Sequence, residues 1–226
     1  LIRLRMTILS HNHAHLMLSM QSQMNSKISA DWVKKNFPYL RAVVIEGAEA
    51  IEHHGWKWWK KQNCDAAQLQ MEIVDIWHFI LSAILIKTQN DQDAAMQLLM
   101  SVNQKSSDCE QIEFDGNSYE LSSLSLLAKL ELLIGVSVSR RIELSLFSAL
   151  LFDCKMDWET LFQQYVGKNV LNFFRQDHGY RDGSYLKVWN GKEDNEHLVD
   201  VMNCLDPQDD SYPEKLYKLL ETRYPG

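Results

Sequence analysis

Proline and glycine are scarce in this chain, with 4 and 9 residues respectively among 226. Turn-rich β architectures depend on both residue types, whereas leucine and methionine, which are plentiful here, favour helices. With 46% hydrophobic residues, the chain can bury one sizeable core but scarcely two. The composition therefore predicts an all-α fold in one domain spanning residues 1–226, with an inserted or mobile subregion.

Cysteine is equally sparse. The four cysteines, Cys64, Cys109, Cys154 and Cys204, are widely spaced, and no CxxC pair occurs. Zinc sites and disulfide frameworks require paired or clustered cysteines. The sequence therefore indicates neither, and we expect reduced thiols in a cytoplasmic protein.

Long hydrophobic runs are also missing. The longest, Ile76–Ile86, is interrupted by His78 and falls short of the roughly 18 residues that span a bilayer. The first residues, Leu1–Met6, include two arginines but lack the apolar core of a secretory signal. We therefore expect no membrane association.

Positive charge is in short supply overall, because the formal net charge is −7. General nucleic-acid binders depend on broad phosphate neutralisation, so that class is not expected. One segment is an exception: residues 167–192 contain two acids and five cations, a net +3. These cations are Lys168, Arg175, Arg181, Lys187 and Lys192. An anionic ligand is expected to bind there.

Apolar residues recur at helical spacing along most of the chain. The expected helices cover residues 7–25, 39–54, 65–87, 91–103, 120–137 and 140–152, then a shorter one after 157, and two closing helices at 194–204 and 213–223. Pro38 and Asp65 are start signals for the second and third helices. The polar residues 104–118, with a turn at Asp115-Gly116-Asn117, are predicted to be an exposed loop. Residues 167–195 are predicted to be glycine-punctuated loop around a short helix at 170–175.

Two neighbouring helices each carry a pair of carboxylates three residues apart. Glu46 and Glu49 are the only charges in residues 43–51, and Glu72 and Asp75 are the only ionised side chains in residues 71–86. Spacing of i,i+3 places each pair on one helix face. Burying unpaired carboxylates is costly, and oxygen ligands without cysteine suit Mg²⁺. If the helices pack antiparallel, the four side chains converge on a magnesium site.

Other interpretations of these carboxylates stay open. A single such pair is usually a solvated stripe on an amphipathic helix, but two pairs inside apolar runs favour a metal. A di-iron site is an alternative, because Asp75 and His78 are also i,i+3; a second Glu-x-x-His set is missing. Glu49 and Glu52 form another i,i+3 pair, yet Glu46 lies in the apolar run, so Glu46 and Glu49 are retained.

Four blocks of sequence resemble the dimeric dUTPase family of all-α nucleotide pyrophosphatases. They are Glu46-Gly-Ala-Glu49 leading into Gly55-Trp-Lys-Trp-Trp-Lys60, then Met71-Glu-Ile-Val-Asp-Ile-Trp-His-Phe79, then Gly167-Lys-Asn-Val-Leu-Asn-Phe-Phe-Arg175, and finally the segment from Gly179 to Asn195. The blocks occur in family order and cover about a third of the chain. Residues 88–166 match the family in little beyond their helical pattern, so the resemblance implies a variable helical region there. The resemblance implies a homodimeric dUTP diphosphatase that also cleaves dUDP.

The resemblance also implies roles for individual residues. Glu46, Glu49, Glu72 and Asp75 would bind Mg²⁺, and Glu46, or Glu49 in its place, would deprotonate the water that attacks the α-phosphorus. The phosphates would be bound by Lys57, Lys60, Lys168, Asn172, Arg175, Tyr180, Lys187 and Lys192. The base and sugar would be bound by Gln21, Asn25, Trp58, His78, Phe79 and Asn195.

The residues themselves support part of this assignment. Gln21 and Asn25 are i,i+4 on one helix face, and side-chain amides can present a donor and an acceptor to the uracil edge. A histidine such as His78 is, taken alone, more often a hydrogen-bonded core residue. The tryptophans of residues 56–60 are also typical of a corner between helix and loop, with the lysines extended into solvent.

Two competing functions remain at this point. A MazG-type or dCTP-directed pyrophosphohydrolase would use the same metal site with a different base. A non-catalytic nucleotide-binding or partner-binding protein would keep the fold without the chemistry, although intact carboxylates, cations and amides in one chain argue against it.

Overall fold

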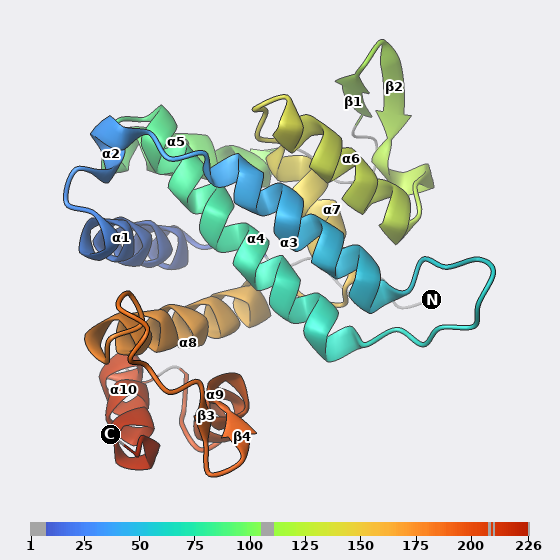
Figure 1. The fold of residues 1–226 in the computed structure, drawn as a ribbon. Helices are drawn as coiled ribbons and strands as arrows, with labels where there is room; N and C mark the ends of the chain where they lie inside the picture. Colours follow the sequence, from blue (N-terminus) through green and yellow to red (C-terminus); the bar gives the residue numbers. More distant parts are fainter. Residues whose placement is uncertain (1–7, 105–110, 208, 210, 226) are drawn as a thin grey trace.

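The computed structural model describes residues 8–104, 111–207, 209 and 211–225, and it confirms the all-α fold (Figure 1). The described residues form ten α-helices: α1 (His11–Ile28), α2 (Trp32–Lys35), α3 (Tyr39–His54), α4 (Ala66–Lys87), α5 (Gln92–Met100), α6 (Leu126–Val138), α7 (Leu144–Asp153), α8 (Trp158–Asp177), α9 (Asp194–Met202) and α10 (Tyr212–Arg223). Short 3₁₀ turns lie at η1 (Ser101–Gln104) and η2 (Leu121–Ser123).

Two small antiparallel sheets complete the described structure. One is a hairpin of β1 (Gln111–Phe114) and β2 (Asn117–Glu120), and the other pairs β3 (Val188–Trp189) with β4 (Lys192–Glu193). The second hairpin leads directly into α9. It therefore places the start of that helix close to the ends of β3 and β4.

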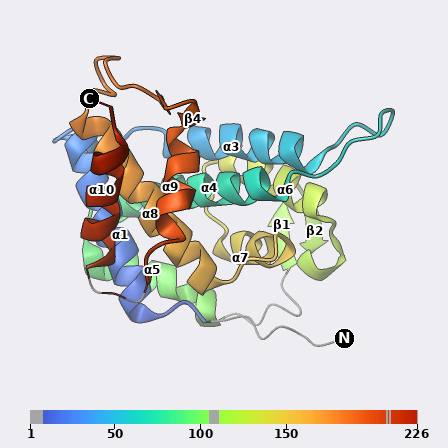
Figure 2. The same cartoon turned by 90° about the horizontal axis from the view of Figure 1, so that it is seen from below.

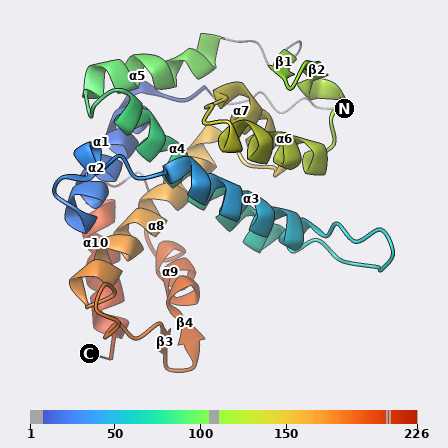
Figure 3. The ribbon, with the colours of Figure 1, turned by 45° about the horizontal axis from the view of Figure 1, so that its top comes forward.

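The antiparallel pair α3 and α4 forms the centre of the fold and its most extensive helix contact. Pro38 precedes α3, and Gly55 ends it with a φ of +86°, a left-handed value that glycine adopts without strain. The Asp65 side chain accepts a hydrogen bond from the Gln68 backbone N–H at 3.1 Å and so caps α4. The connection between the helices extends away from the body of the molecule (Figures 1 and 3).

Helix α4 is long and apolar enough to cross a membrane by composition, which the interrupted run of residues 76–86 did not indicate. Two thirds of its apolar window is nevertheless buried inside the molecule, against α3, α1, α8 and α5. Trp77 on α4 stacks on Phe147 of α7 at 4.6 Å between ring centroids and lies 5.3 Å from Trp158 of α8. These contacts are those of a central core helix.

One prediction about the C-terminal half was wrong. Residues 158–177 form a single helix, α8, so the segment that begins at Gly167 is not a loop around a short helix. Gly167 lies inside α8, where a Cβ atom would come within 2.5 Å of the Met202 sulfur on α9. A residue with a Cβ atom there would require the flexible end of the Met202 side chain to move. Because α8 is continuous, Lys168 and Arg175 are placed by a rigid helix.

The region around residue 115 also differs from the prediction. The expected turn is the tip of the β1–β2 hairpin rather than part of a plain loop, with Asp115 and Gly116 both at positive φ. Because Glu120 belongs to β2, helix α6 begins at Leu126 instead of about 120. Helix α7 begins at Leu144, four residues later than predicted, after Arg140 has adopted a φ of +62°.

Helices α8, α9 and α10 pack on one another, and α8 also contacts α1 and α4. Figures 2 and 3 show this group, with β3 and β4, beside the α3–α4 pair. The two predicted closing helices are confirmed as α9 and α10. This arrangement brings the C-terminal segment to the carboxylate-bearing face of α3 and α4.

Candidate active site

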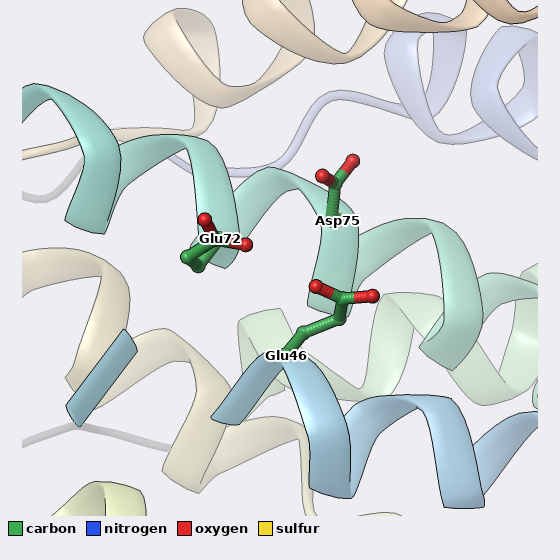
Figure 4. Close-up of side chains that lie close together, drawn as sticks. All are labelled: Glu46, Glu72 and Asp75. Carbon is green, nitrogen blue, oxygen red and sulfur yellow. The ribbon is translucent and has the colours of Figure 1, made fainter. Parts of the chain in front are cut away.

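Three of the four predicted carboxylates form a tight cluster between α3 and α4. One oxygen each of Glu46, Glu72 and Asp75 lies within 4.8 Å of the others. Figure 4 shows Glu46 reaching from α3 toward the two acids of α4. Glu49 lines the same cavity, one helical turn along α3. The two i,i+3 pairs therefore face one another.

The carboxylates line a cavity of about 570 Å³, a size typical of small-molecule sites. Helices α3 and α4 form one wall, and α8 with the segment of β3, β4 and α9 forms another. The lining residues are Glu46, Glu49, His53, Gln68, Met71, Glu72, Asp75, Lys168, Lys187, Glu193, Asn195 and Glu196. Acidic side chains outnumber the basic ones.

Crowding of the acids changes their protonation. Burial, together with the negative charges of Asp75, Glu72 and Glu49, raises the pKa of Glu46 to about 8. Burial and the charge of Asp75 raise the pKa of Glu72 to about 7. Four acids in one cavity thus favour binding of a proton or another cation.

Two cationic or ionisable side chains contact the cluster. The Lys168 ammonium lies 3.1 Å from Asp75 Oδ2, and His53 Nε2 lies 3.4 Å from Glu72 Oε1. Sequence reasoning assigned Lys168 to phosphate and gave His53 no role in the site. The signal for His53 was available: it follows Glu49 by four residues and so shares its helix face.

The raised pKa values predict how stability changes with pH in the presence of a chelator. The folded protein keeps protons on Glu46 and Glu72 up to about pH 8 and 7, whereas the unfolded chain releases them near pH 4.5. Because the folded state binds more protons in this window, its free energy of unfolding falls as pH rises from about 5 to 8. We expect the thermal unfolding midpoint to fall accordingly.

The control for that experiment is a pair of variants. Glu46→Gln removes one of the two acids with raised pKa values and also its charge from the cluster, so its unfolding midpoint should depend less on pH than that of the wild type. Glu52→Gln removes an acid outside the cavity and should follow the wild type. Parallel pH curves for the wild type and Glu46→Gln would contradict the assignment.

The C-terminal half brings two predicted phosphate ligands, Lys168 and Lys187, and one predicted base or sugar ligand, Asn195, to the cavity. Lys187 and Asn195 line it, as Lys168 does, and Lys187 Nζ also lies 3.4 Å from Glu193 Oε2. Lys192 is not a lining residue and instead pairs with Asp200 at 2.9 Å. The structure therefore brings Lys168, Lys187 and Asn195 together with the acids.

Arg175 is held by a buried acid that the sequence did not single out. Its Nε and Nη2 donate to the two carboxylate oxygens of Asp194 at 2.8 and 2.9 Å, and Asp194 is fully buried. Asn172 accepts from Arg175 Nη1 at 3.3 Å, and the guanidinium lies 5.8 Å from the Tyr180 ring. These three predicted phosphate ligands thus form a group around Arg175, outside the cavity lining.

Lys57, Trp58 and Lys60 lie on the connection between α3 and α4, outside the cavity lining. The Trp58 side chain is 86% exposed. Glu52 faces this connection, because it accepts a hydrogen bond from Trp56 Nε1 at 2.7 Å and lies 3.5 Å from Lys57 Nζ. That orientation supports the pairing of Glu46 with Glu49 rather than of Glu49 with Glu52.

The two amides predicted to read the base are buried and hydrogen-bonded to each other. Gln21 Nε2 donates to Asn25 Oδ1 at 3.1 Å and to Ser82 Oγ at 2.9 Å. Gln21 Oε1 accepts from the Tyr165 hydroxyl at 3.0 Å. Sequence reasoning missed Ser82 and Tyr165, since both lie on other helices. Neither amide is a lining residue of the cavity.

His78 lies next to this polar group, with its ring 4.3 Å from that of Tyr165. Its Nδ1 is 2.9 Å from the Val74 carbonyl oxygen, and burial lowers its pKa to about 4, so the ring is neutral. Its Nε2 has no hydrogen-bond partner among the described residues. The neighbouring Phe79 is half-buried against the core. The predicted base-binding residues Gln21, Asn25 and His78 thus form one cluster through Tyr165 and Ser82.

Similarity to a known protein family agrees with this arrangement of carboxylates. The model of the dUTPase family matches residues 13–180, well over half of the chain, including all four carboxylates. No curated protein matches the chain. With an all-α fold and a clustered set of acids at the matched positions, the chain belongs to the dUTPase family of the all-α type and is a dUTP diphosphatase, a hydrolase that acts on nucleotides.

Proposed function

We propose that the enzyme hydrolyses dUTP, and also dUDP, to dUMP with the help of Mg²⁺ bound at the carboxylate cluster. The observation that carries the proposal is the convergence of Glu46, Glu72 and Asp75 within 4.8 Å. The donor set fits magnesium, because all the ligands are hard carboxylate oxygens and the raised pKa values of Glu46 and Glu72 indicate a site that favours a cation. Glu49 would complete the set. Bound Mg²⁺ supplies charge neutralisation for the polyphosphate.

The chain's own residues would perform the proton transfer. Glu46 orients a water molecule and accepts its proton while the water oxygen bonds to the α-phosphorus. The bond from the α-phosphorus to the bridging oxygen breaks, and pyrophosphate leaves from dUTP or phosphate from dUDP. Glu49 is the second candidate for this base, since it lines the same cavity.

We assign polyphosphate binding first to Lys168 and Lys187, because they line the cavity, and we keep the assignment of Asn195, which lines it too, to the base or sugar. Uracil recognition is assigned to the cluster of Gln21, Asn25 and His78, with Phe79 beside it. A buried polar group that lacks its partner costs free energy, so an amide site matched to uracil disfavours cytosine. Lys57, Trp58, Lys60, Asn172, Arg175, Tyr180 and Lys192 remain predicted ligands outside the cavity lining.

We further propose that the chain is one catalytic domain, that it acts in the cytoplasm and that it forms a homodimer. Exposed apolar side chains such as Ile45, Trp58 and Trp59 supply surface for an interface. Light scattering coupled to gel filtration measures the mass directly. A mass near 26.3 kDa, that of one chain, would contradict the dimer.

A hydrolysis assay tests the activity. We expect the purified protein with Mg²⁺ to cleave dUTP and dUDP, to cleave dCTP and dTTP far more slowly, and to lose activity with a chelator. Preference for dCTP would overturn the assignment of the base cluster while leaving the carboxylate site in place. Absence of hydrolysis with all four nucleotides would overturn the proposal.

A further inference from the structure

Lys168 is a buried cation among the acids that line the cavity. It lies on α8, and its side chain is 10% exposed. The ammonium is 3.1 Å from Asp75 Oδ2, and this is the one salt bridge that Lys168 makes within the described ranges. A buried ammonium requires an anionic partner, because its desolvation is otherwise uncompensated. Asp75 is that partner here.

Asp75 is also a member of the cluster that we assign to Mg²⁺. An ammonium and a divalent cation on the same carboxylate repel each other, and at separations of a few ångströms this repulsion is large even in a polar cavity. The ammonium has three donors and no acceptor, so it cannot contribute a ligand to a metal. Lys168 and a metal therefore compete for Asp75.

We propose that Lys168 couples metal binding to nucleotide binding by exchanging partners. Its ammonium neutralises Asp75 until a divalent cation binds that carboxylate, and it then moves to a phosphate oxygen of the nucleotide in the same cavity. The inference rests on the proposed function and deepens it. Lys168 thus opposes the binding of Mg²⁺ alone and favours the binding of Mg²⁺ together with a polyphosphate.

The proposal predicts that removal of the Lys168 charge changes two dissociation constants in opposite directions. In Lys168→Met, the Kd for Mg²⁺ without nucleotide should fall at least about tenfold, because a repulsive unit charge is removed from the site. The Kd for a non-hydrolysable α,β-imido analogue of dUTP with Mg²⁺ should rise by a similar factor. Isothermal titration calorimetry measures both, independently of hydrolysis.

Two further variants serve as controls. Lys187→Met removes a cation that lines the same cavity but pairs with Glu193 rather than with the cluster. It should therefore weaken binding of the nucleotide analogue and leave the Kd for Mg²⁺ nearly unchanged. Lys168→Arg keeps the charge and should retain an Mg²⁺ affinity near that of the wild type. If Lys168→Met does not fold, Lys168→Gln takes its place.

An affinity of Lys168→Met for Mg²⁺ that is unchanged or weaker than that of the wild type would overturn the exchange. The exchange would also be overturned if Lys187→Met gained as much affinity for Mg²⁺ as Lys168→Met does. Neither result touches the proposed hydrolysis, which the wild-type protein demonstrates or fails to demonstrate in the nucleotide assay. If the wild-type protein hydrolyses none of the nucleotides while Lys168→Met binds Mg²⁺ more tightly, the competition for Asp75 is supported and the proposed substrate is wrong.

Discussion

Replacement of Glu46 by glutamine is expected to lower kcat for dUTP hydrolysis by about a thousandfold, within the range that general-base catalysis supplies. Glu46 lies at the centre of the cluster, with Glu72 and Asp75 both close to its carboxylate. The amide is nearly the same size but cannot accept the water proton, and it removes one negative charge from the metal site. Steady-state kinetics at saturating Mg²⁺ measure the effect.

The matched control is Glu52→Gln on the same helix. Glu52 accepts a hydrogen bond from Trp56 and faces the connection between α3 and α4, so its loss should leave kcat nearly unchanged. Glu49→Gln distinguishes the two candidates for the base. If it lowers kcat more than Glu46→Gln does, the proton acceptor is Glu49. Full activity of Glu46→Gln would falsify the carboxylate mechanism.

The acidic pairs were predictable because their geometry is local. Residues three apart on a helix share a face whatever the rest of the chain does, so Glu72 and Asp75 had to lie together once the helix formed. The approach of Glu46 required one further assumption, that α3 and α4 pack antiparallel across a short connection. The structure bears this out (Figure 1).

The extent of α8 was not predictable from local pattern. Glycine lowers helix propensity, so Gly167 favoured a break between two segments. The helix nevertheless continues through Gly167, and the missing Cβ atom leaves room for the Met202 side chain of α9 in its present position. This contact joins residues more than thirty positions apart, and neither residue alone indicates it.

A count of charges likewise could not show which cations of residues 167–192 line the cavity and which pair with acids elsewhere. The net charge of +3 predicted a basic segment for an anionic ligand, and two of its cations, Lys168 and Lys187, line the cavity together with the acids. Lys192 and Arg175, however, pair with acids outside the cavity lining, Asp200 and Asp194, whereas the acids paired with Lys168 and Lys187 line the cavity. Which acid each cation pairs with depends on tertiary contacts that a linear count of charges does not contain.

The ion pair of Asp194 and Arg175 leads to the second large prediction, which concerns stability. Asp194 also accepts a hydrogen bond from the Tyr185 hydroxyl at 2.9 Å. Burial acts to raise the pKa of Asp194, but the hydrogen bonds and charge of Arg175 outweigh it and hold that pKa below its usual range. Asp194→Asn leaves the half-buried guanidinium without its anion, and loss of one partner of a buried pair costs about 3–5 kcal/mol.

Urea denaturation measures this loss, and Asp200→Asn is the matched control. Asp200 lies on the same helix, α9, but its pair with Lys192 is exposed to solvent, so its replacement should leave the unfolding midpoint nearly unchanged. Equal midpoints for the two variants would show that the buried pair does not stabilise the fold.

The same pair also bears on substrate binding, because it fixes the start of α9. The Asp194 backbone N–H donates to the Lys187 carbonyl oxygen at 2.9 Å, and Lys187 and Asn195 both line the cavity. Loosening this segment should therefore raise KM for dUTP more than it lowers kcat.

Arg175→Lys then separates two roles of the arginine. If Arg175 holds Asp194, the lysine variant loses stability and substrate affinity together, since it lacks the bidentate contact. If Arg175 instead binds phosphate, KM rises while the urea midpoint stays unchanged.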